Sequence, residues 1–252
     1  MSGPGGGAGG ARAGLAGQTV VVVGGSAGIG LETARQVRAA GGEVVLTARN
    51  AERLQRAADE VDTVRTAAFD AHDTVSLEGF LRELPGQVDH VMLTAGSPSY
   101  TPLAELDPAE AGRDFGGRIA MTVAVARAGR EKVRAGGSLL FMGGTGGRRP
   151  AAGMAVTGAL TAASPALIAN LALEVAPVRV NLIAAGFVDT PLSASLLGDR
   201  LDARREQLRR TLPIGRVVGP ADVAALALHL MTNDALTGAT YDVDGGQQLV
   251  TP

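Results

Sequence analysis

The sequence has no cysteine, only three histidines and only one lysine among its 252 residues. Without cysteine the protein forms no disulfides, no thiolate metal site and no cysteine nucleophile, which fits a reducing cytoplasm. The histidines, His72, His90 and His229, are widely separated, and neither an HxH nor an HExxH spacing occurs. We therefore expect a cytoplasmic protein with no metal site.

Charge and hydropathy also exclude some partners. The formal net charge is -2 and the pI is about 5.9, so no overall basic character favours nucleic acid. No apolar run reaches the roughly 18 residues of a membrane span, so we expect no membrane partner. The Gly/Ala-rich residues 1–17 lack the apolar run of a secretory signal, and we expect a flexible tail.

Apolar runs of strand length alternate with segments of helical period along the rest of the chain. This pattern predicts an α/β fold with a single Rossmann-type, doubly wound, parallel seven-stranded sheet and helices on both faces, over residues 18–252. The expected strands are 19–23, 43–48, 64–69, 90–93, 138–142, 179–183 and 240–243. The expected helices are 29–40, 51–61, 74–84, 108–135, 154–175 and 220–231.

A glycine-rich turn follows the first apolar run. In TVVVVGGSAGIGLETARQV, Gly24, Gly28 and Gly30 let the backbone turn tightly and approach a pyrophosphate. The following helix offers free N–H groups and the positive end of its dipole to the phosphates. Because this turn opens a βαβ unit, we interpret it as a dinucleotide cradle; the alternative is a tight strand–helix turn without a ligand.

The end of the second strand indicates which dinucleotide is bound. An NAD site usually places Asp or Glu about 20 residues beyond the glycines, where the carboxylate accepts from the ribose 2′-hydroxyl. Here Ala48 offers no carboxylate, and Arg49 follows it with a guanidinium that suits a 2′-phosphate. We expect NADP(H) as the cofactor; the alternative for Arg49 is a solvated loop arginine.

Further motifs follow in a consistent order: FDAHD at 69–73, TAG at 94–96, LALEVAPVRVNLIAAGFVDTP at 171–191 and TGATYDVDGG at 237–246. With GGSAGIG they resemble the motifs of the short-chain dehydrogenase/reductase family, although Val23, Leu93 and Thr94 depart from its pattern. The resemblance implies that Asp70 contacts adenine and that Val188 and Thr190 contact the nicotinamide carboxamide. The predicted cofactor-binding residues are Gly24, Ser26, Gly28, Ile29, Gly30, Arg49, Asp70, Ala71, Ala95, Gly96, Val188 and Thr190.

The catalytic positions that this resemblance implies carry other residues. The family uses an Asn, a Ser and a Tyr-x-x-x-Lys pair, in which Tyr is the general acid/base and Lys lowers its pKa and holds the ribose. Counting from LALEVAP places the tyrosine position at Thr157 and the lysine position at Thr161. The serine position falls on Gly144, beside Thr145, and the asparagine position falls near Arg118. We expect a divergent member of the family that lacks its Ser, Tyr and Lys.

Loss of the tyrosine removes the group that protonates an alkoxide. A phenol has an ordinary pKa near 10 that a nearby cation can lower, whereas a threonine hydroxyl is a far weaker acid. A positioned general acid contributes about 10²–10⁴ in rate, and one oxyanion donor contributes about 10²–10³. Reduction by the family's standard route should therefore be severely impaired.

The candidate substitutes are Arg118, Thr157, Thr145 and Tyr100. Arg118 brings a permanent cation for an oxyanion or a substrate carboxylate, or else it is a helix-surface or subunit-interface arginine. Tyr100, in the loop SPSYTP, is a phenol near the site, or else it packs its own loop. Thr145 and Thr157 donate hydrogen bonds but not readily protons, and Thr157 is equally a plain helix residue.

Several arginines fall near the expected cleft. Arg148 and Arg149 follow the missing serine, and Arg204 and Arg205 lie in the amphipathic LDARREQLRRTLP. The segment near 192–215 that contains the latter pair corresponds, by the resemblance, to a mobile lid that shapes substrate specificity. We expect solvated arginines at these positions and at Arg209 and Arg210 of the same segment. The alternatives are that Arg148 or Arg149 faces the cleft and that the lid arginines hold an anionic substrate.

Three functions remain open. The first is an atypical NADP(H)-dependent oxidoreductase that acts on a carbonyl or alcohol, with a small molecule as substrate. The second is an NADP(H)-binding protein without redox turnover, either a sensor or a repurposed cleft. The third is a pseudoenzyme subunit that supports an active relative. The resemblance implies a homodimer or homotetramer through the helices at 108–135 and 154–175, or a hetero-oligomer with an active relative.

Overall fold

Valine-rich runs form the central strands of a seven-stranded sheet in a computed structural model that describes residues 14–250. The strands lie in the order β3-β2-β1-β4-β5-β6-β7, and neighbouring strands are parallel throughout. Their bounds are β1 Thr19–Val23, β2 Glu43–Ala48, β3 Arg65–Ala68, β4 Val88–Leu93, β5 Val133–Gly144, β6 Arg179–Ala185 and β7 Thr240–Val243. The predicted fold class is confirmed.

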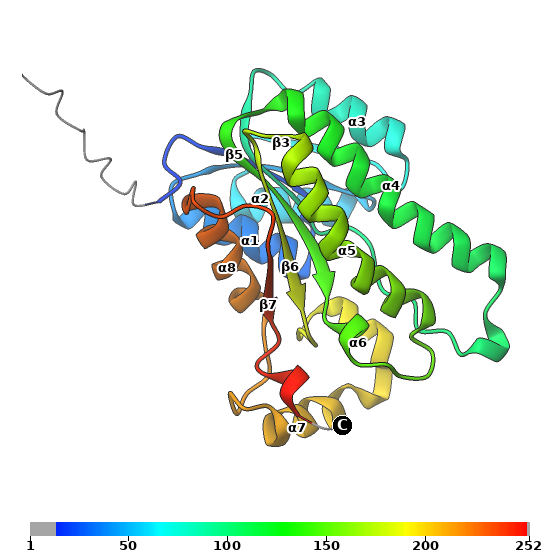
Figure 1. Cartoon of the computed structure of the whole chain (residues 1–252). Coiled ribbons are helices and arrows are strands. Elements are labelled where there is room, and N and C mark those ends of the chain that lie inside the picture. Colours follow the sequence, from blue (N-terminus) through cyan, green and yellow to red (C-terminus); the bar gives the residue numbers. More distant parts are fainter. Residues whose placement is uncertain (1–13, 251–252) are drawn as a thin grey trace, which may run out of the picture.

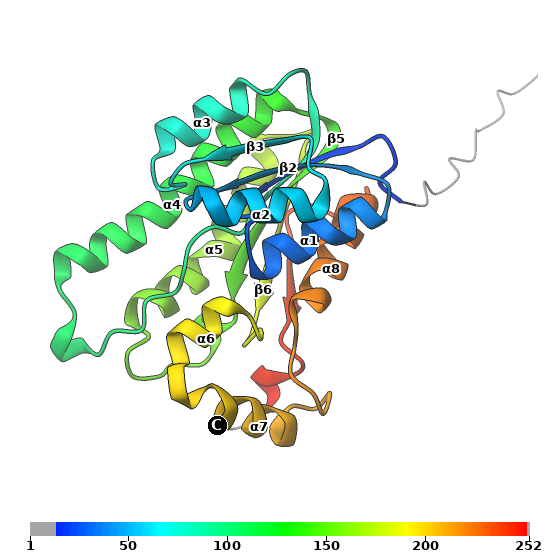
Figure 2. The ribbon, with the colours of Figure 1, turned by 180° about the vertical axis from the view of Figure 1, so that it is seen from behind.

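Helices cover both faces of the sheet. In Figure 1, α3 Thr74–Arg82, α4 Pro108–Lys132 and α5 Ala155–Glu174 lie in front of the strands. In Figure 2 the opposite face carries α1 Gly28–Ala39, α2 Ala51–Val61 and α8 Pro220–Thr232. Successive side chains of a strand point to opposite faces, so Val21 and Val23 pack with the first layer and Val20 and Val22 with the second.

The strand order reverses between β1 and β4, which are hydrogen-bonded neighbours although two strands separate them in sequence. In open parallel sheets, ligands bind beyond the carboxyl ends of the strands at this switch point. The segment predicted as a lid lies at the same edge, where it forms α6 Pro191–Leu197 and α7 Leu201–Thr211 (Figure 1). Its closure over a substrate stays a prediction.

The predicted tail ends earlier than the sequence indicated. Residues 1–13 lie outside the described residues, whereas Leu15 is fully buried and its N–H donates to the carbonyl of Ala40 at 2.9 Å. Leu15 packs with Val20 and Val37 in one of the two core layers. Residues 14–17 therefore belong to the fold, because one leucine among glycines and alanines buries enough apolar surface to fix them.

The predicted helix at 108–135 is also too long. It ends at Lys132, and Val133 begins β5 by pairing with Val88 of β4. Gly137 then passes so close to β4 that a Cβ atom there would lie 2.2 Å from the carbonyl oxygen of Asp89. The helical period of the sequence could not reveal this change, because strand pairing with a distant segment causes it.

Helix α5 has 20 residues and is apolar enough to span a membrane, although we expected no apolar run of that length. Over an 18-residue window its mean hydropathy is 1.5, so by length and composition alone it could cross a membrane. Its inner face packs on the sheet through Ile168 and Leu171, as a layer helix of an α/β fold does. Only 17% of that window is buried, and Leu173 is exposed, so an apolar face of α5 stays uncovered in the single chain.

His90 couples the stability of the fold to pH. Its ring lies between Ser138 Oγ at 2.8 Å and Gln18 Oε1 at 2.7 Å, and 1% of the residue is exposed. Burial lowers its pKa to about 3, while Asp89 opposes this shift. Because the unfolded chain takes up this proton near pH 6.5, its contribution to stability is complete above that pH. It is lost progressively between about pH 6.5 and 3.

We expect the free energy of unfolding to fall as the pH is lowered from 7 to 5, with a slope from this group approaching about 1.4 kcal/mol per pH unit. His90→Gln removes the imidazole and should flatten the dependence, although it lowers stability at pH 7. Urea titrations across this range measure both effects. The control His229→Gln removes an exposed histidine, and an unchanged slope in His90→Gln would refute the assignment.

Candidate functional site

The glycine turn between β1 and α1 is tied to the end of β4. Gly24 has φ +98°, and a Cβ atom there would lie 2.6 Å from the N of Ala95. The Thr94 hydroxyl lies 3.1 Å from the carbonyl oxygens of both Val23 and Gly24, to which it donates. Thr94 therefore supports the turn from beneath, which gives a structural role to this departure from the family pattern.

A groove opens where the turn meets the start of α1. It is lined by Ser26, Ala27, Gly28, Leu31, Pro191 and Pro220, among others. The methyl group of Thr190, the N-cap of α6, lies on the other side of Gly28. The predicted residues Gly28 and Thr190 are thus brought together beside Ile29, at the start of α1, where no side chain caps the helix.

Two arginines lie near the end of β2 and the glycine turn. Arg49 follows β2 and is largely exposed, with its guanidinium 3.9 Å from a carboxylate oxygen of Asp70. Arg53 donates from Nε to the hydroxyl of Ser26 at 3.2 Å, so a second guanidinium lies on the glycine turn itself. Sequence reasoning missed Arg53. Its position one helical turn after Arg49, with Asn50 capping α2, was the available signal.

Asp70 is held in its ionised form at the end of β3. One carboxylate oxygen accepts from the N–H of His72 at 3.0 Å and lies 3.1 Å from the ring Nδ1 of His72. The hydrogen bond from this N–H is the main cause that lowers the pKa of Asp70, with smaller contributions from the ring and from Arg49. Ala71 is buried beside it, so the predicted adenine end of the site is a fixed, anionic corner.

The segment after β6 forms the opposite wall. Val188 is buried and pairs with Val218, while the Asp189 carboxylate receives two hydrogen bonds from Arg205 of α7, at 2.9 and 2.8 Å. The bidentate pair fixes α7 against this wall. Arg205 is consequently a structural contact of the lid segment rather than the solvated side chain that the sequence indicated.

Arg118 reaches from α4 to the carboxyl end of β4. Its Nη1 donates to the carbonyl oxygen of Ala95 at 3.0 Å. Gly96 has φ +106°, and a Cβ atom there would lie 1.6 Å from the same nitrogen, so the guanidinium occupies the space over this glycine. Burial lowers the pKa of Arg118, yet an arginine remains charged at neutral pH. It forms no salt bridge among residues 14–250.

Thr157 has a clear local role. Its hydroxyl donates to the carbonyl oxygen of Ser99 at 2.6 Å and accepts from the Ser99 N–H at 3.1 Å. These two bonds anchor the loop after β4 to the first turn of α5. Four residues later, the Thr161 hydroxyl donates back to α5 carbonyls at Thr157 and Gly158. Both hydroxyl protons are therefore engaged by main-chain oxygens of the protein.

Gly144 ends β5 beside Thr161 of α5, and Thr145 follows it. Thr145 is buried, and its N–H donates to the carbonyl of Ala185 at 3.1 Å; its hydroxyl has no hydrogen-bond partner among residues 14–250. A Cβ atom on Gly144 would lie 3.2 Å from Cγ2 of Thr161, so a serine fits there only tightly. Of the two candidate threonines, Thr145 therefore has the hydroxyl that is free of hydrogen bonds among residues 14–250, whereas the Thr157 hydroxyl makes two.

Tyr100 lies in the loop that Thr157 anchors. The residue is 54% exposed, while partial burial of its hydroxyl raises its pKa and the nearby Arg204 opposes that rise. A raised pKa makes the phenol a poorer acid at neutral pH than an ordinary tyrosine. Arg204 lies near Tyr100, but the pKa of Tyr100 is raised, whereas the pKa of the family's tyrosine is lowered by its lysine.

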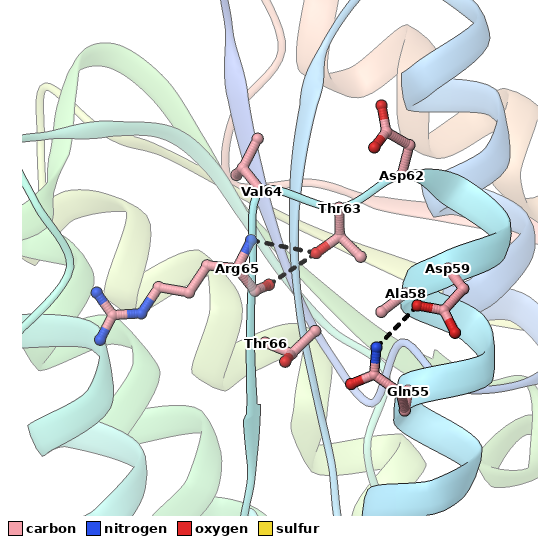
Figure 3. Close-up of a pocket in the computed structure, with 8 residues that line it drawn as sticks. All are labelled: Gln55, Ala58, Asp59, Asp62, Thr63, Val64, Arg65 and Thr66. Carbon is pink, nitrogen blue, oxygen red and sulfur yellow. Dashed lines mark hydrogen bonds between the residues drawn. The ribbon is translucent and has the colours of Figure 1, made fainter.

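A second hollow lies at the opposite edge of the sheet. Figure 3 shows it between the end of α2, with Gln55 and Asp59, and the chain that enters β3 through Thr63. Its hydrogen bonds are local, from Gln55 Nε2 to Asp59 at 2.8 Å and from Thr63 Oγ1 to the carbonyl of Arg65 at 2.9 Å. Because it adjoins the amino end of a strand, it is separate from the switch-point edge.

The fold and the glycine turn define a dinucleotide-binding α/β protein of the Rossmann type. The family model described as enoyl-(acyl carrier protein) reductase matches residues 23–248. Carbonyl reductase family member 4 of Danio rerio is 30% identical over 247 residues, which cover 91% of this chain and 98% of that protein. Short-chain dehydrogenase/reductase malC of Malbranchea aurantiaca is 26% identical, with 93% and 96% covered. The chain belongs to the short-chain dehydrogenase/reductase family.

Solved structures agree with this assignment. The MalC reductase/Diels-Alderase from Malbranchea aurantiaca matches with a TM-score of 0.86 and 25% identity, covering 93% of this chain and 98% of that one. A small-chain dehydrogenase in complex with NADPH matches with a TM-score of 0.78 and 28% identity, covering 92% and 99%. Family membership and these neighbours support binding of a nicotinamide cofactor at the switch-point edge.

Proposed function

We propose that the protein is an NADP(H)-dependent oxidoreductase for a carbonyl or alcohol substrate, in which the Arg118 guanidinium stabilises the developing oxyanion. The observation that carries this proposal is the Arg118 guanidinium itself. It lies over Gly96 at the carboxyl end of β4, it is desolvated, and it has no carboxylate partner among residues 14–250. A cation held in this way is available to a developing oxyanion.

Arg49 and Arg53 support NADP(H) rather than NAD(H). Arg49 is exposed at the ribose end and Arg53 is fixed on Ser26, so two guanidinium groups flank the space beyond the glycine turn. An arginine fork suits a phosphate monoester, whereas a 2′-hydroxyl needs an acceptor. When bound, NADP(H) supplies or accepts the hydride.

Arg49→Ala is expected to weaken NADPH binding by about 10- to 100-fold and NADH binding by less than about threefold, because only NADPH carries the 2′-phosphate. Titration of the purified protein while following cofactor fluorescence measures both constants. Arg56→Ala is the matched control, since Arg56 is exposed on α2 without a salt bridge among residues 14–250. Equal weakening for both cofactors would remove the 2′-phosphate argument.

The remaining residues divide the chemistry as follows. The positive charge of Arg118 stabilises the alkoxide formed from a carbonyl, and Thr145 provides a further hydroxyl at the end of β5. Thr157 does not supply the proton, because its hydroxyl is bound to Ser99. Tyr100 is a weakened acid, so water is the proton source that the site favours. Such a route suits an activated carbonyl whose alkoxide needs little assistance.

The apolar face of α5 supports a homodimer or homotetramer. Leu173 is exposed, and only Thr157, Ile168 and Leu171 are buried along its 20 residues. Helices α4 and α5 lie side by side on one face of the sheet (Figure 1), and a second copy would cover this surface. Equilibrium sedimentation at micromolar concentration tests it, and a monomer would leave the hetero-oligomer with an active relative as the remaining arrangement.

A second candidate function is NADP(H) binding with a non-redox reaction in the cleft. The hydroxyls of Thr157 and Thr161 are hydrogen-bonded to main-chain oxygens, so neither side chain is available to transfer a proton. This favours a non-redox reaction. The similar MalC reductase/Diels-Alderase from Malbranchea aurantiaca combines a reductase with a Diels-Alderase, so this fold accommodates both kinds of activity.

One experiment separates these candidates. The purified protein is saturated with NADPH and then given a panel of activated ketones and quinones, with absorbance of the reduced cofactor as the readout. Consumption supports the oxidoreductase. Binding of NADPH without its consumption supports the non-redox function. If NADPH does not bind, a pseudoenzyme subunit that supports an active relative remains the best interpretation.

A further inference from the structure

In each of two pairs of adjacent arginines, one arginine forms a salt bridge and the other does not. Arg148 makes a bidentate salt bridge to Asp242, and Arg205 makes one to Asp189. Their sequence neighbours, Arg149 and Arg204, form no salt bridge among residues 14–250. One member of each pair is thus neutralised at the surface while the other keeps its charge unbalanced.

The two unbalanced arginines are both linked to Phe187, Arg204 through the ring and Arg149 through Gln247. The Cζ atom of Arg204 lies 6.0 Å from the centre of the Phe187 ring. Arg149 donates to the main-chain oxygen of Gln247, whose side-chain oxygen accepts from the N–H of Phe187 at 2.9 Å. The charges therefore come from the loop after β5 and from α7, and Phe187 with Gln247 holds them close together.

Their partners are neutral throughout. Arg204 donates to the side-chain oxygen of Gln207 at 2.8 Å, and Arg149 donates to a main-chain oxygen. Burial lowers the pKa of Arg204, the charge of Arg149 lowers it further, and Tyr100 acts in the opposite direction. Two like charges that are partly desolvated destabilise the fold unless an anion compensates them.

The pair also lies on the substrate side of the site. Phe187 directly precedes Val188, in the wall that follows β6, and Arg149 lies five residues beyond Gly144 at the end of β5. Because Arg204 belongs to α7, the pair joins the loop after β5 to the lid segment, which lies beyond the carboxyl ends of the strands (Figure 2).

We propose that Arg149 and Arg204 form a subsite for an anionic group of the substrate, a carboxylate or a phosphate. This deepens the proposed function, since it assumes that the cleft beside Phe187 receives the substrate. Arginine is suited to this task because its planar fork donates two parallel hydrogen bonds to either anion. The substrate class is therefore a carbonyl or alcohol compound that also carries a negative charge.

The test is calorimetric binding of phenylglyoxylate, its methyl ester and phenyl phosphate to the purified protein, with and without saturating NADPH. Phenylglyoxylate should bind about 10- to 100-fold more tightly than the ester, because charge-assisted hydrogen bonds are lost on esterification. Arg149→Gln and Arg204→Gln should each remove most of this preference. Arg209→Gln, on the exposed face of α7, and Arg148→Gln are the matched controls and should retain it.

The outcomes distinguish this subsite from the proposed function. Equal binding of acid and ester, or a preference that survives in Arg149→Gln and Arg204→Gln, overturns the subsite even if NADPH is bound and consumed. A preference that these variants abolish supports the subsite even if NADPH is not consumed. Tighter binding of phenyl phosphate than of phenylglyoxylate identifies a phosphate, and the reverse identifies a carboxylate.

Discussion

Replacement of Arg118 by glutamine is expected to lower kcat/KM for an activated ketone by about 10²–10³, the usual effect of removing one oxyanion-stabilising group. The Nη1 group lies over Gly96 and is desolvated, so its charge acts with little screening by water. The loss should appear mainly in kcat, because the interaction strengthens only as negative charge develops on the substrate oxygen. Steady-state kinetics at saturating NADPH measure it.

Two further variants separate charge from structure. Arg118→Lys keeps the charge but loses the planar fork, so it should recover part of the activity. Arg113→Gln removes an exposed arginine five residues earlier on α4 and should leave kcat unchanged. If Arg118→Gln retained full activity with an unchanged thermal midpoint, the guanidinium would have no catalytic role. A large fall in the thermal midpoint alone would indicate that it acts by holding Ala95.

Restoration of the family's residues is the second large effect. The combined variant Thr157→Tyr, Thr161→Lys and Gly144→Ser is expected to raise ketone reductase activity by about 10²–10⁴, the contribution of a positioned general acid. The changes belong together, because a side chain on Gly144 meets Cγ2 of Thr161 at 3.2 Å. The pH profile should also gain a new limb, since a phenol tuned by a lysine titrates near the working pH.

Thr157 complicates this design in a way that a control can resolve. The tyrosine would break the two hydrogen bonds that anchor Ser99, so the loop of Tyr100 loses its attachment to α5. Thr157→Val removes the hydroxyl with almost the same shape and reports the effect of that loss alone. No gain from the triple variant, together with intact NADPH binding and an unaffected Thr157→Val, would contradict the view that the missing tetrad limits the rate.

The cofactor half of the site followed from the sequence because its determinants are local. A buried strand, a glycine turn and a helix start occupy residues 19–39 without interruption, and Arg49 directly follows the next strand. The turn needs Gly24 because its φ is positive, which the sequence expresses directly. Arg53 escaped notice because its contact with Ser26 depends on how α2 packs beside the turn.

The catalytic half depended on contacts between distant segments. Counting residues placed Thr157 at the tyrosine position, but only the fold brings Ser99, 58 residues away, against its hydroxyl. The orientation of Arg118 over Gly96 likewise joins α4 to the end of β4. Sequence reasoning treated both as open alternatives because spacing specifies a position on a helix but not its partner.

The arginines show most clearly which properties follow from the sequence and which from the tertiary structure. Arg148 and Arg149 are adjacent and chemically identical, as are Arg204 and Arg205, so no pattern in the sequence separates them. The fold places Asp242 and Asp189 beside one member of each pair and Phe187 beside Arg204. The sequence by itself determined the parallel sheet, the glycine turn and the family, because periodicity and turn chemistry are short-range properties. Tertiary structure alone decided which charges are neutralised, because a salt bridge depends on the distance between two side chains in space.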